Sequence, residues 1–366
     1  DPGTTPHQNL RFLAVVSVVL QAVHRHADVL RAAIASPGND HRLGGNEAPP
    51  AIISVFLGSM LDKIFNSIEK GEASQATESQ IINLGVGHIP NISKDYTDRN
   101  RTSPFAFTGN KFEFRAVGAS ANVSVPVSIL NAAVAESFKD ATTRLKELLA
   151  KKKNRDEAVM ELVRSLTVEH KNIRFEGNNY SEEWRKEATK RGLPILNSTA
   201  DALAVLHDEK ATEFLVSTKV FTRPEIASRY HIAVERYNKT VEIELRALIE
   251  LTTGFILPAI EAQIRNSAET LKFLSSAGAK TLQAKRVQTL ETTLETILKE
   301  LNVLSAGVES LHSKTHDTEI TQTIAKELKP VAAQLRNACD TAETLVSDSL
   351  WPLPKYREML FLNSQA

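Results

Sequence analysis

The sequence has one cysteine, no excess of either charge and no apolar run of membrane-spanning length. Cys339 is the only cysteine in 366 residues, so an internal disulfide is impossible, which fits a reducing cytosol. Lys plus Arg number 44 and Asp plus Glu also number 44, so nothing indicates a nucleic-acid or anionic-membrane surface. The most apolar stretch, FLAVVSVVLQAV, is about half the length of a bilayer-spanning helix. We therefore expect a cytoplasmic protein that binds neither nucleic acid nor a membrane.

Several familiar catalytic motifs are also missing. The sequence holds no phosphate-binding glycine loop, no zinc-type cysteine pair and no nucleophile elbow. Its composition, with 42% hydrophobic and 24% charged residues, is ordinary for a globular protein long enough to form two domains. Chemistry must therefore be sought in less regular motifs.

The hydrophobic pattern is mainly helical. It predicts a buried helix from Pro6 to Ile34, a second helix from Ala51 to Glu69, and nearly continuous helix after Pro126. Breaks are expected near Asn178, Gly192 and Pro224. Residues 111–117, KFEFRAV, alternate with period two, so we expect a strand with Phe112, Phe114 and Ala116 on one face. The fold class is α+β and predominantly helical.

The last third carries a heptad pattern. Apolar residues recur at steps of three and four from Val287 to Leu311, and again from Ile320 to Leu345 after the turn HSKTHD. Such a pair of stripes predicts a long antiparallel helical hairpin.

Three polar stretches could carry chemistry, and each has an ordinary alternative. GNDHRLGGNEAPP, residues 38–50, places Arg42 and Glu47 among glycines, but a surface loop can look the same. RNRTSPF holds the pair Arg99 and Arg101, which a solvated loop would also tolerate.

The third stretch is the polar face of the expected strand. Lys111, Glu113 and Arg115 would form its solvent side in most proteins. A carboxylate between two cations also suits a site that holds a metal and an anion together. Glu113 would then be a hard oxygen ligand for Mg²⁺, and Lys111 and Arg115 would face phosphate or carboxylate oxygens.

Together these stretches resemble a known family. NDHRLGGNEAPPAI, RNRTSPF and KFEFRAVGASAN occur in the order typical of glutamine synthetase, and WPLPKYREM near the C-terminus is similar to type III forms. The resemblance implies ATP-dependent ligation of ammonia to L-glutamate through γ-glutamyl phosphate. It implies that residues 1–250 form the C-terminal portion of a catalytic domain of barrel strands and helices, and that residues 251–366 form a helical-hairpin extension.

The resemblance also implies roles for single residues. Arg42 would bind the glutamate carboxylate, and Glu47 would be the flap acid that helps remove a proton from ammonia. Arg101 would contact the transferring phosphate and ATP, and Lys111 would be a further ATP contact. Glu113 would bind Mg²⁺ or Mn²⁺, and Arg115 would face the substrate. A second family arginine is replaced near Ala106.

The resemblance further implies that the segment is the C-terminal half of its enzyme and inactive alone, and that the enzyme is a homo-oligomer of stacked rings, a dodecamer. Two alternatives stay open. The protein could be a γ-glutamyl ligase for another amine, or a non-catalytic helical assembly module.

Overall fold

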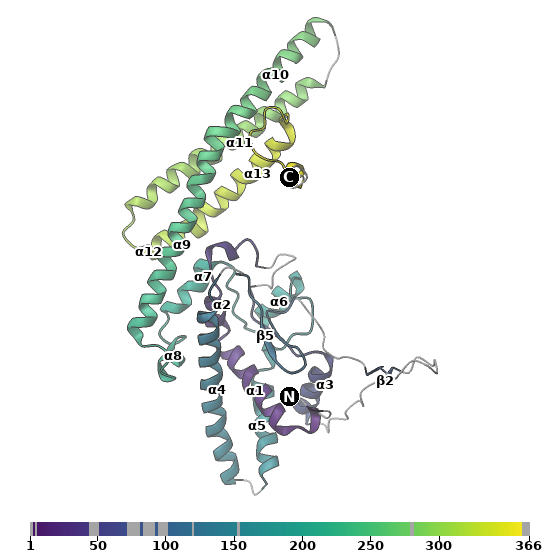
Figure 1. Ribbon diagram of the computed structural model, residues 1–366, viewed down its shortest axis with the longest axis vertical. Coiled ribbons are helices and arrows are strands. Elements are labelled where there is room, and N and C mark those ends of the chain that lie inside the picture. The colour runs from purple at the N-terminus through teal and green to yellow at the C-terminus, as the bar shows by residue number, and fades with distance from the viewer. Residues whose placement is uncertain are drawn as a thin grey trace, which may run out of the picture. The chain divides into compact units, whose positions relative to one another are not determined.

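The structure is a computed structural model, and it describes Gly3 and residues 6–43, 51–71, 81–82, 92–93, 102–118, 121–151, 154–278 and 282–360. The chain divides into two compact units, Asp1–Ala233 and Val234–Ala366. The described chain is predominantly helical with a small sheet, as the hydrophobic pattern predicts (Figure 1). The predicted functional division after residue 250 stays a prediction.

A three-stranded sheet lies in the first unit. Its central strand β4 (Phe105–Phe107) pairs in parallel with β1 (Val55–Phe56) and antiparallel with β5 (Phe112–Phe114). A separate antiparallel ribbon joins β2 (Ile81–Ile82) to β3 (Ile92–Ser93). The strand predicted over 111–117 is therefore confirmed in its centre but shorter. Phe112 and Phe114 pack on the core as expected, whereas Ala116 lies beyond the strand and is exposed.

The helix predicted from Pro6 to Ile34 is two helices. After a 3₁₀ turn (Pro6–Gln8), Asn9 caps α1 (Leu10–Arg25) because its Oδ1 accepts from the Phe12 amide at 3.0 Å. The chain then bends by 73° into α2 (Ala27–Ala33). No proline or glycine stands at this bend, where the His26 ring lies 3.8 Å from the Phe214 ring. A tertiary contact therefore marks a break that the local sequence does not encode.

The helix predicted over Ala51–Glu69 is wrong in its first part. Residues 52–58 are buried, Val55–Phe56 among them enter the sheet as β1, and α3 runs only over Ser59–Lys70. Three β-branched residues, Ile52, Ile53 and Val55, favour extended backbone here. Gly58 separates strand from helix with a φ of 84°, which a residue with a side chain rarely adopts.

Helices α1, α4 (Ser124–Lys151) and α5 (Arg155–Glu169) pack against one another, and α3 packs on α5 (Figure 1). The hydrophobic core joins residues from α1 to both β1 and β4. In the described chain no single helix is long and apolar enough to cross a membrane, although α1 and α2 together, as a bent pair, reach that length and composition. The remaining helices of this unit are α6 (Glu182–Lys190), α7 (Thr199–Ala204) and α8 (Glu213–Ser217), with 3₁₀ turns at Pro37–Asn39, Lys171–Ile173 and Val205–His207.

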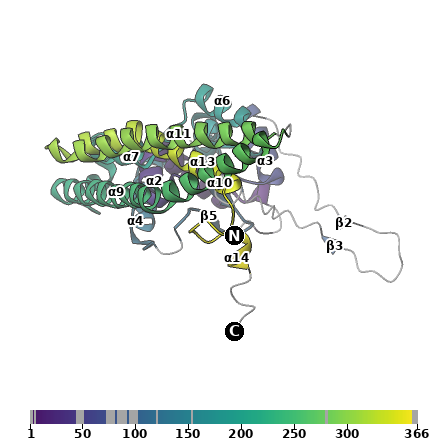
Figure 2. The same cartoon turned by 90° about the horizontal axis from the view of Figure 1, so that it is seen from above.

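Long helices make up the second unit. Helix α9 (Arg223–Leu251), which begins in the first unit, passes through a π-helical turn (Thr252–Ile256) into α10 (Leu257–Ser276). Helix α11 (Gln283–Ser310) packs on α10 and on α13 (Lys329–Leu345), as Figure 2 shows. A 3₁₀ turn (Leu311–Ser313), α12 (Asp317–Thr323) and a second π-helical turn (Ile324–Leu328) precede α13, and α14 (Tyr356–Leu360) follows it.

The heptad pattern agrees with burial along α11. Leu290, Ile297, Leu304 and Val308 are all buried, whereas Lys285, Thr292 and Lys299 on the other faces are exposed. Prolines explain the two π-helical turns, because Pro258 and Pro330 each follow one and lack the amide hydrogen that a regular α-helix needs.

Candidate active site

Strand β5 brings three of the predicted site residues together. Glu113 Oε2 accepts from Arg115 at 3.1 Å from the terminal nitrogen and 3.3 Å from Nε, and Glu113 Oε1 lies 3.7 Å from Lys111 Nζ. The Thr108 hydroxyl donates to Glu113 Oε1 at 3.4 Å. The carboxylate thus lies between two cations, as the alternation of the sequence predicts.

The charge state of Glu113 follows from these contacts. The hydrogen bond from Arg115 is the main cause that lowers the pKa of the Glu113 carboxyl, and the charges of Arg115 and Lys111 act in the same direction. The Glu113 side chain is 39% exposed, so the carboxylate is ionised at neutral pH and open to solvent on one side. An ionised, accessible carboxylate beside basic groups is what a site for a divalent cation and a phosphate needs.

The chain that follows Arg101 lies directly beside this strand. The Arg115 amide donates to the Pro104 carbonyl at 2.8 Å, and the Ser103 hydroxyl donates to the Phe105 carbonyl at 2.9 Å. Arg101 itself lies outside the described residues. Its neighbours Thr102–Pro104 nevertheless belong to the same corner of the sheet as Arg115.

Ala106 lies directly opposite Glu113 on the neighbouring strand. The two residues are register partners in β4 and β5, and opposed residues of an antiparallel pair share a face. Ala106 is fully buried. The position where the family resemblance implies a second arginine therefore faces the same side as Glu113.

The stretch over residues 38–50 is called the opening loop, and side-chain hydrogen bonds hold its first residues in place. Asn39 is buried and its side-chain Nδ2 donates to the Ile34 carbonyl, and Asp40 Oδ1 accepts from both the backbone amide (2.8 Å) and the hydroxyl (2.7 Å) of Thr199. Arg42 follows in a turn, with its amide donating to the Asn39 carbonyl at 3.0 Å, and its side chain is exposed. Arg42 is not one of the three residues gathered on β5. Glu47 lies outside the described residues, so its predicted role stays a prediction.

The sequence alone did not indicate that Arg31 is a buried cation. The Arg31 side chain is buried and its Nε donates to the Leu196 carbonyl at 3.0 Å, while Asp40 and Asp201 supply compensating negative charge. The two terminal nitrogens of Arg31 form no hydrogen bond, so only charge connects this guanidinium to Asp40 and Asp201. Its position in an apolar helical run was the only available signal.

A second missed element is the segment after α5, which extends the sheet beyond β1. Arg174 forms a parallel bridge with Val55, and the Phe175 amide donates to the Val55 carbonyl at 2.9 Å. Glu176 Oε1 then accepts from the Leu57 amide at 2.8 Å. A stretch more than a hundred residues later in the sequence therefore flanks the strand that follows the opening loop.

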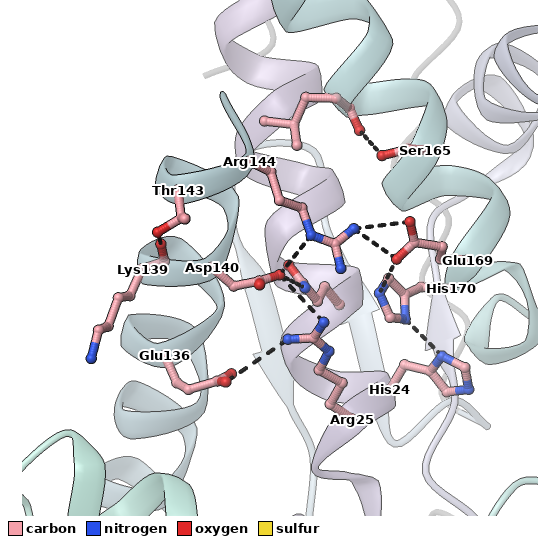
Figure 3. Close-up of polar contacts among 12 residues, drawn as sticks. His24, Arg25, Glu136, Lys139, Asp140, Thr143, Arg144, Ser165, Glu169 and His170 are labelled. Carbon is pink, nitrogen blue, oxygen red and sulfur yellow. Dashed lines mark hydrogen bonds and ion pairs between the residues drawn. The ribbon is translucent and has the colours of Figure 1, made fainter. Parts of the chain in front are cut away.

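A polar cluster at the seam of α1, α4 and α5 is separate from these residues (Figure 3). Arg144 donates to both oxygens of Glu169 at 2.9 and 2.8 Å and pairs with Asp140 at 3.1 Å. Arg25 and Gln21 also reach Asp140, and His24 contacts His170. Every charge has a nearby partner here, so the cluster joins three helices rather than presenting a reactive group.

A metal site is incomplete within the described chain. No three His, Cys, Asp or Glu side chains of the described residues gather closely enough to hold a metal ion. Mg²⁺ commonly takes one or two protein carboxylates and fills its other positions with water and substrate phosphates. Glu113 therefore fits as one protein ligand of a magnesium ion whose other positions would be filled by water and substrate phosphates.

Comparisons with known proteins show which proteins this chain resembles. The family model described as the glutamine synthetase C-terminal domain matches residues 158–274. The chain is 39% identical to the type-3 glutamine synthetase of Dictyostelium discoideum over 370 residues, covering 99% of this chain and 50% of that protein. It is 36% identical to a glutamine synthetase of Bacteroides fragilis (strain YCH46) over 371 residues, covering 98% of this chain and 51% of the relative. The chain thus spans about half the length of the curated relatives it matches, and along nearly its whole length it is similar to glutamine synthetases.

Proposed function

We propose that the protein catalyses ATP-dependent ligation of ammonia to L-glutamate through a γ-glutamyl phosphate. The observation that carries the proposal is the ionised Glu113 carboxylate held between Arg115 and Lys111 at the corner where Thr102–Pro104 enter the sheet. Phosphoryl transfer depends mainly on positive charge placed around the transferring group. Two cations on one strand, beside the chain segment that follows Arg101, supply such charge.

In this proposal Glu113 is one ligand of Mg²⁺ or Mn²⁺, which would offset the negative charge of the ATP phosphates when bound. Lys111 and Arg101 contact ATP and the transferring phosphate, and Arg115 faces the substrate. The ion pair between Glu113 and Arg115 keeps both side chains oriented before substrate arrives, so less order must be imposed during binding.

The opening loop supplies the remaining groups. Arg42 binds the glutamate carboxylate, because a guanidinium forms paired hydrogen bonds with a planar carboxylate. Glu47 accepts a proton from ammonia as it attacks the acyl phosphate. The anchored turn at Asn39 and Asp40 fixes where this loop begins.

The wider architecture belongs to the same proposal. Strands β1, β4 and β5 would be part of a larger barrel, and residues 251–366 would form a helical-hairpin extension of a cytoplasmic, ring-shaped homo-oligomer, a dodecamer of stacked rings. The packing of α11 on α13 supports the hairpin.

The test is glutamine formation by the whole protein and by its Glu113→Gln variant, at a range of Mg²⁺ concentrations. Glu113→Gln should lower activity or metal affinity by at least about tenfold, since even residues that only support metal ligands cost about 10–100-fold. Glu235→Gln is a matched control, because Glu235 is also an exposed carboxylate paired with a cation, Lys239. Equal activity of both variants would refute the assigned role. Faster product formation with ethylamine than with ammonia would favour a ligase for another amine.

A further inference from the structure

Asn179 connects two strands of the candidate site across the first unit. It is 1% exposed, and its Nδ2 donates to the Ser54 hydroxyl at 2.6 Å. On its other side, Asn179 Oδ1 accepts from the Thr102 hydroxyl at 3.3 Å, and the Asn179 amide donates to the same Thr102 oxygen at 3.3 Å. One side chain therefore bonds to both residues, and Ser54 is itself fully buried.

The two partners both precede strands of the sheet that are neighbours. Ser54 stands directly before β1, and Thr102 lies shortly before β4, its parallel neighbour. In the sequence, Ser54 follows Pro50 by four residues and Thr102 follows Arg101 directly. Asn179 thus ties together the points at which two of the motif-bearing segments enter the sheet.

A shift at these points would reach the charged face of β5. Pro104 accepts a hydrogen bond from the Arg115 amide, and Ala106 is the register partner of Glu113. Movement of Thr102 would therefore shift the start of β4, and with it Arg115 and Glu113, relative to β1. Protein interiors transmit such shifts because they are densely packed.

We propose that Asn179 is a positioning residue for the ligase reaction: it fixes β4 against β1 so that Arg115 and Glu113 hold their places. The inference rests on the proposed function. The hydrogen bond from the Leu57 amide to Glu176 holds the segment that contains Asn179 against the end of β1. Asn179 therefore has a fixed position from which it bonds to Thr102.

The experiment compares Asn179→Ala with Asn172→Ala in the whole protein. Asn172 is a fitting control because its side-chain Nδ2 also donates to a distant residue, the Arg191 carbonyl at 3.0 Å, and bonds to neither Ser54 nor Thr102. At a temperature where both variants are folded by circular dichroism, Asn179→Ala should lower kcat by about 10–100-fold, since a misplacement of about 1 Å costs that much. Asn172→Ala should lower the thermal midpoint and keep kcat.

A second pair of variants covers the case in which Asn179→Ala does not fold. Thr102→Val removes the hydroxyl at nearly constant shape and should lower kcat, whereas Thr102→Ser keeps the hydroxyl and should restore it. Full kcat in Asn179→Ala, or in Thr102→Val, would overturn this inference alone. A wild-type protein that forms no glutamine would overturn the proposed function, and the inference with it.

Discussion

The Nδ1 atoms of His24 and His170 lie 2.9 Å apart in the seam between α1 and α5. A contact of this kind requires one ring to donate and the other to accept, so the accepting imidazole must be neutral. Burial is the main cause that lowers the pKa of His170 to about 4, and the charges of His24, Arg25 and Arg144 lower it further, against Asp140. Burial and Arg25 also lower the pKa of His24. Protonation of both rings would place two positive charges in contact.

This pair predicts a loss of stability in mild acid. A histidine whose pKa falls on folding binds more protons when unfolded, so the free energy of unfolding rises with pH. The stability that depends on a neutral His170 is fully present above about pH 6.5 and is lost as pH falls towards about 4. The loss from His170 amounts to up to about 3 kcal/mol, because one pKa unit corresponds to ~1.4 kcal/mol.

Urea denaturation at a series of pH values from about 7.5 to 4.5 measures this effect. The free energy of unfolding should depend less steeply on pH in His170→Gln than in the wild-type chain. His231→Gln, which changes an exposed histidine, should keep the wild-type slope. A His170→Gln slope equal to that of the wild type would show that the histidine pair is not the source.

Arg174 and Lys171 bind the same carboxylate from different environments. Lys171 Nζ lies 2.9 Å from Glu69 Oε1 and is the main cause of the lowered pKa of Glu69, but its side chain is 52% exposed. Arg174 is 6% exposed, pairs with Glu69 at 3.1 Å and lies 3.5 Å from Asp62. Loss of the buried Arg174 should lower the free energy of unfolding more than loss of the exposed Lys171, because water cannot readily take the place of a buried cation beside Glu69.

Arg174→Met should therefore lower the free energy of unfolding by about 1–3 kcal/mol, less than the ~3–5 kcal/mol of a fully buried pair because the carboxylates reach solvent. Lys171→Met should cost at most about 1 kcal/mol. Guanidinium denaturation of the two variants measures the difference. Equal losses would mean that burial of Arg174 does not decide its contribution.

The roles proposed for Glu47 and Arg42 can be tested by kinetics of the whole protein. Glu47→Ala should leave ATP binding nearly intact and lower amide formation by about 10²–10⁴-fold, because proton removal follows phosphorylation. Arg42→Ala should instead raise the KM for glutamate steeply, since a paired carboxylate contact is lost. A reduction of less than about tenfold in Glu47→Ala would contradict the role given to this acid.

The end of α10 is a candidate contact between subunits. Phe273 is 72% exposed, and Leu271 beside it is half-buried. If this surface joins subunits, Leu271→Asp combined with Phe273→Asp should dissociate the whole protein into smaller folded assemblies in sedimentation experiments. Lys272→Asp changes the charge without removing apolar surface and should leave the assembly intact. An unchanged oligomer in the double variant would leave residues 251–366 as an internal brace.

Local pattern was sufficient for several features of this protein. The period-two alternation predicted β5, and with it the meeting of Lys111, Glu113 and Arg115, because neighbours at even spacing on a strand share a face. The heptad pattern likewise predicted the buried positions of α11, since steps of three and four follow one face of a helix. Such features depend on residues close together in the sequence.

Only the tertiary structure decided the features that join distant segments. The bend at His26 lies where the His26 ring meets Phe214, and Val55–Phe56 become strand because β4 supplies the hydrogen-bond partners that an isolated apolar run lacks. Asn179 carried no local signal, and Arg31 carried only its position in an apolar helical run. Their importance comes from Leu196, Ser54 and Thr102, which folding brings to them, and a buried polar group requires such partners wherever they lie in the sequence.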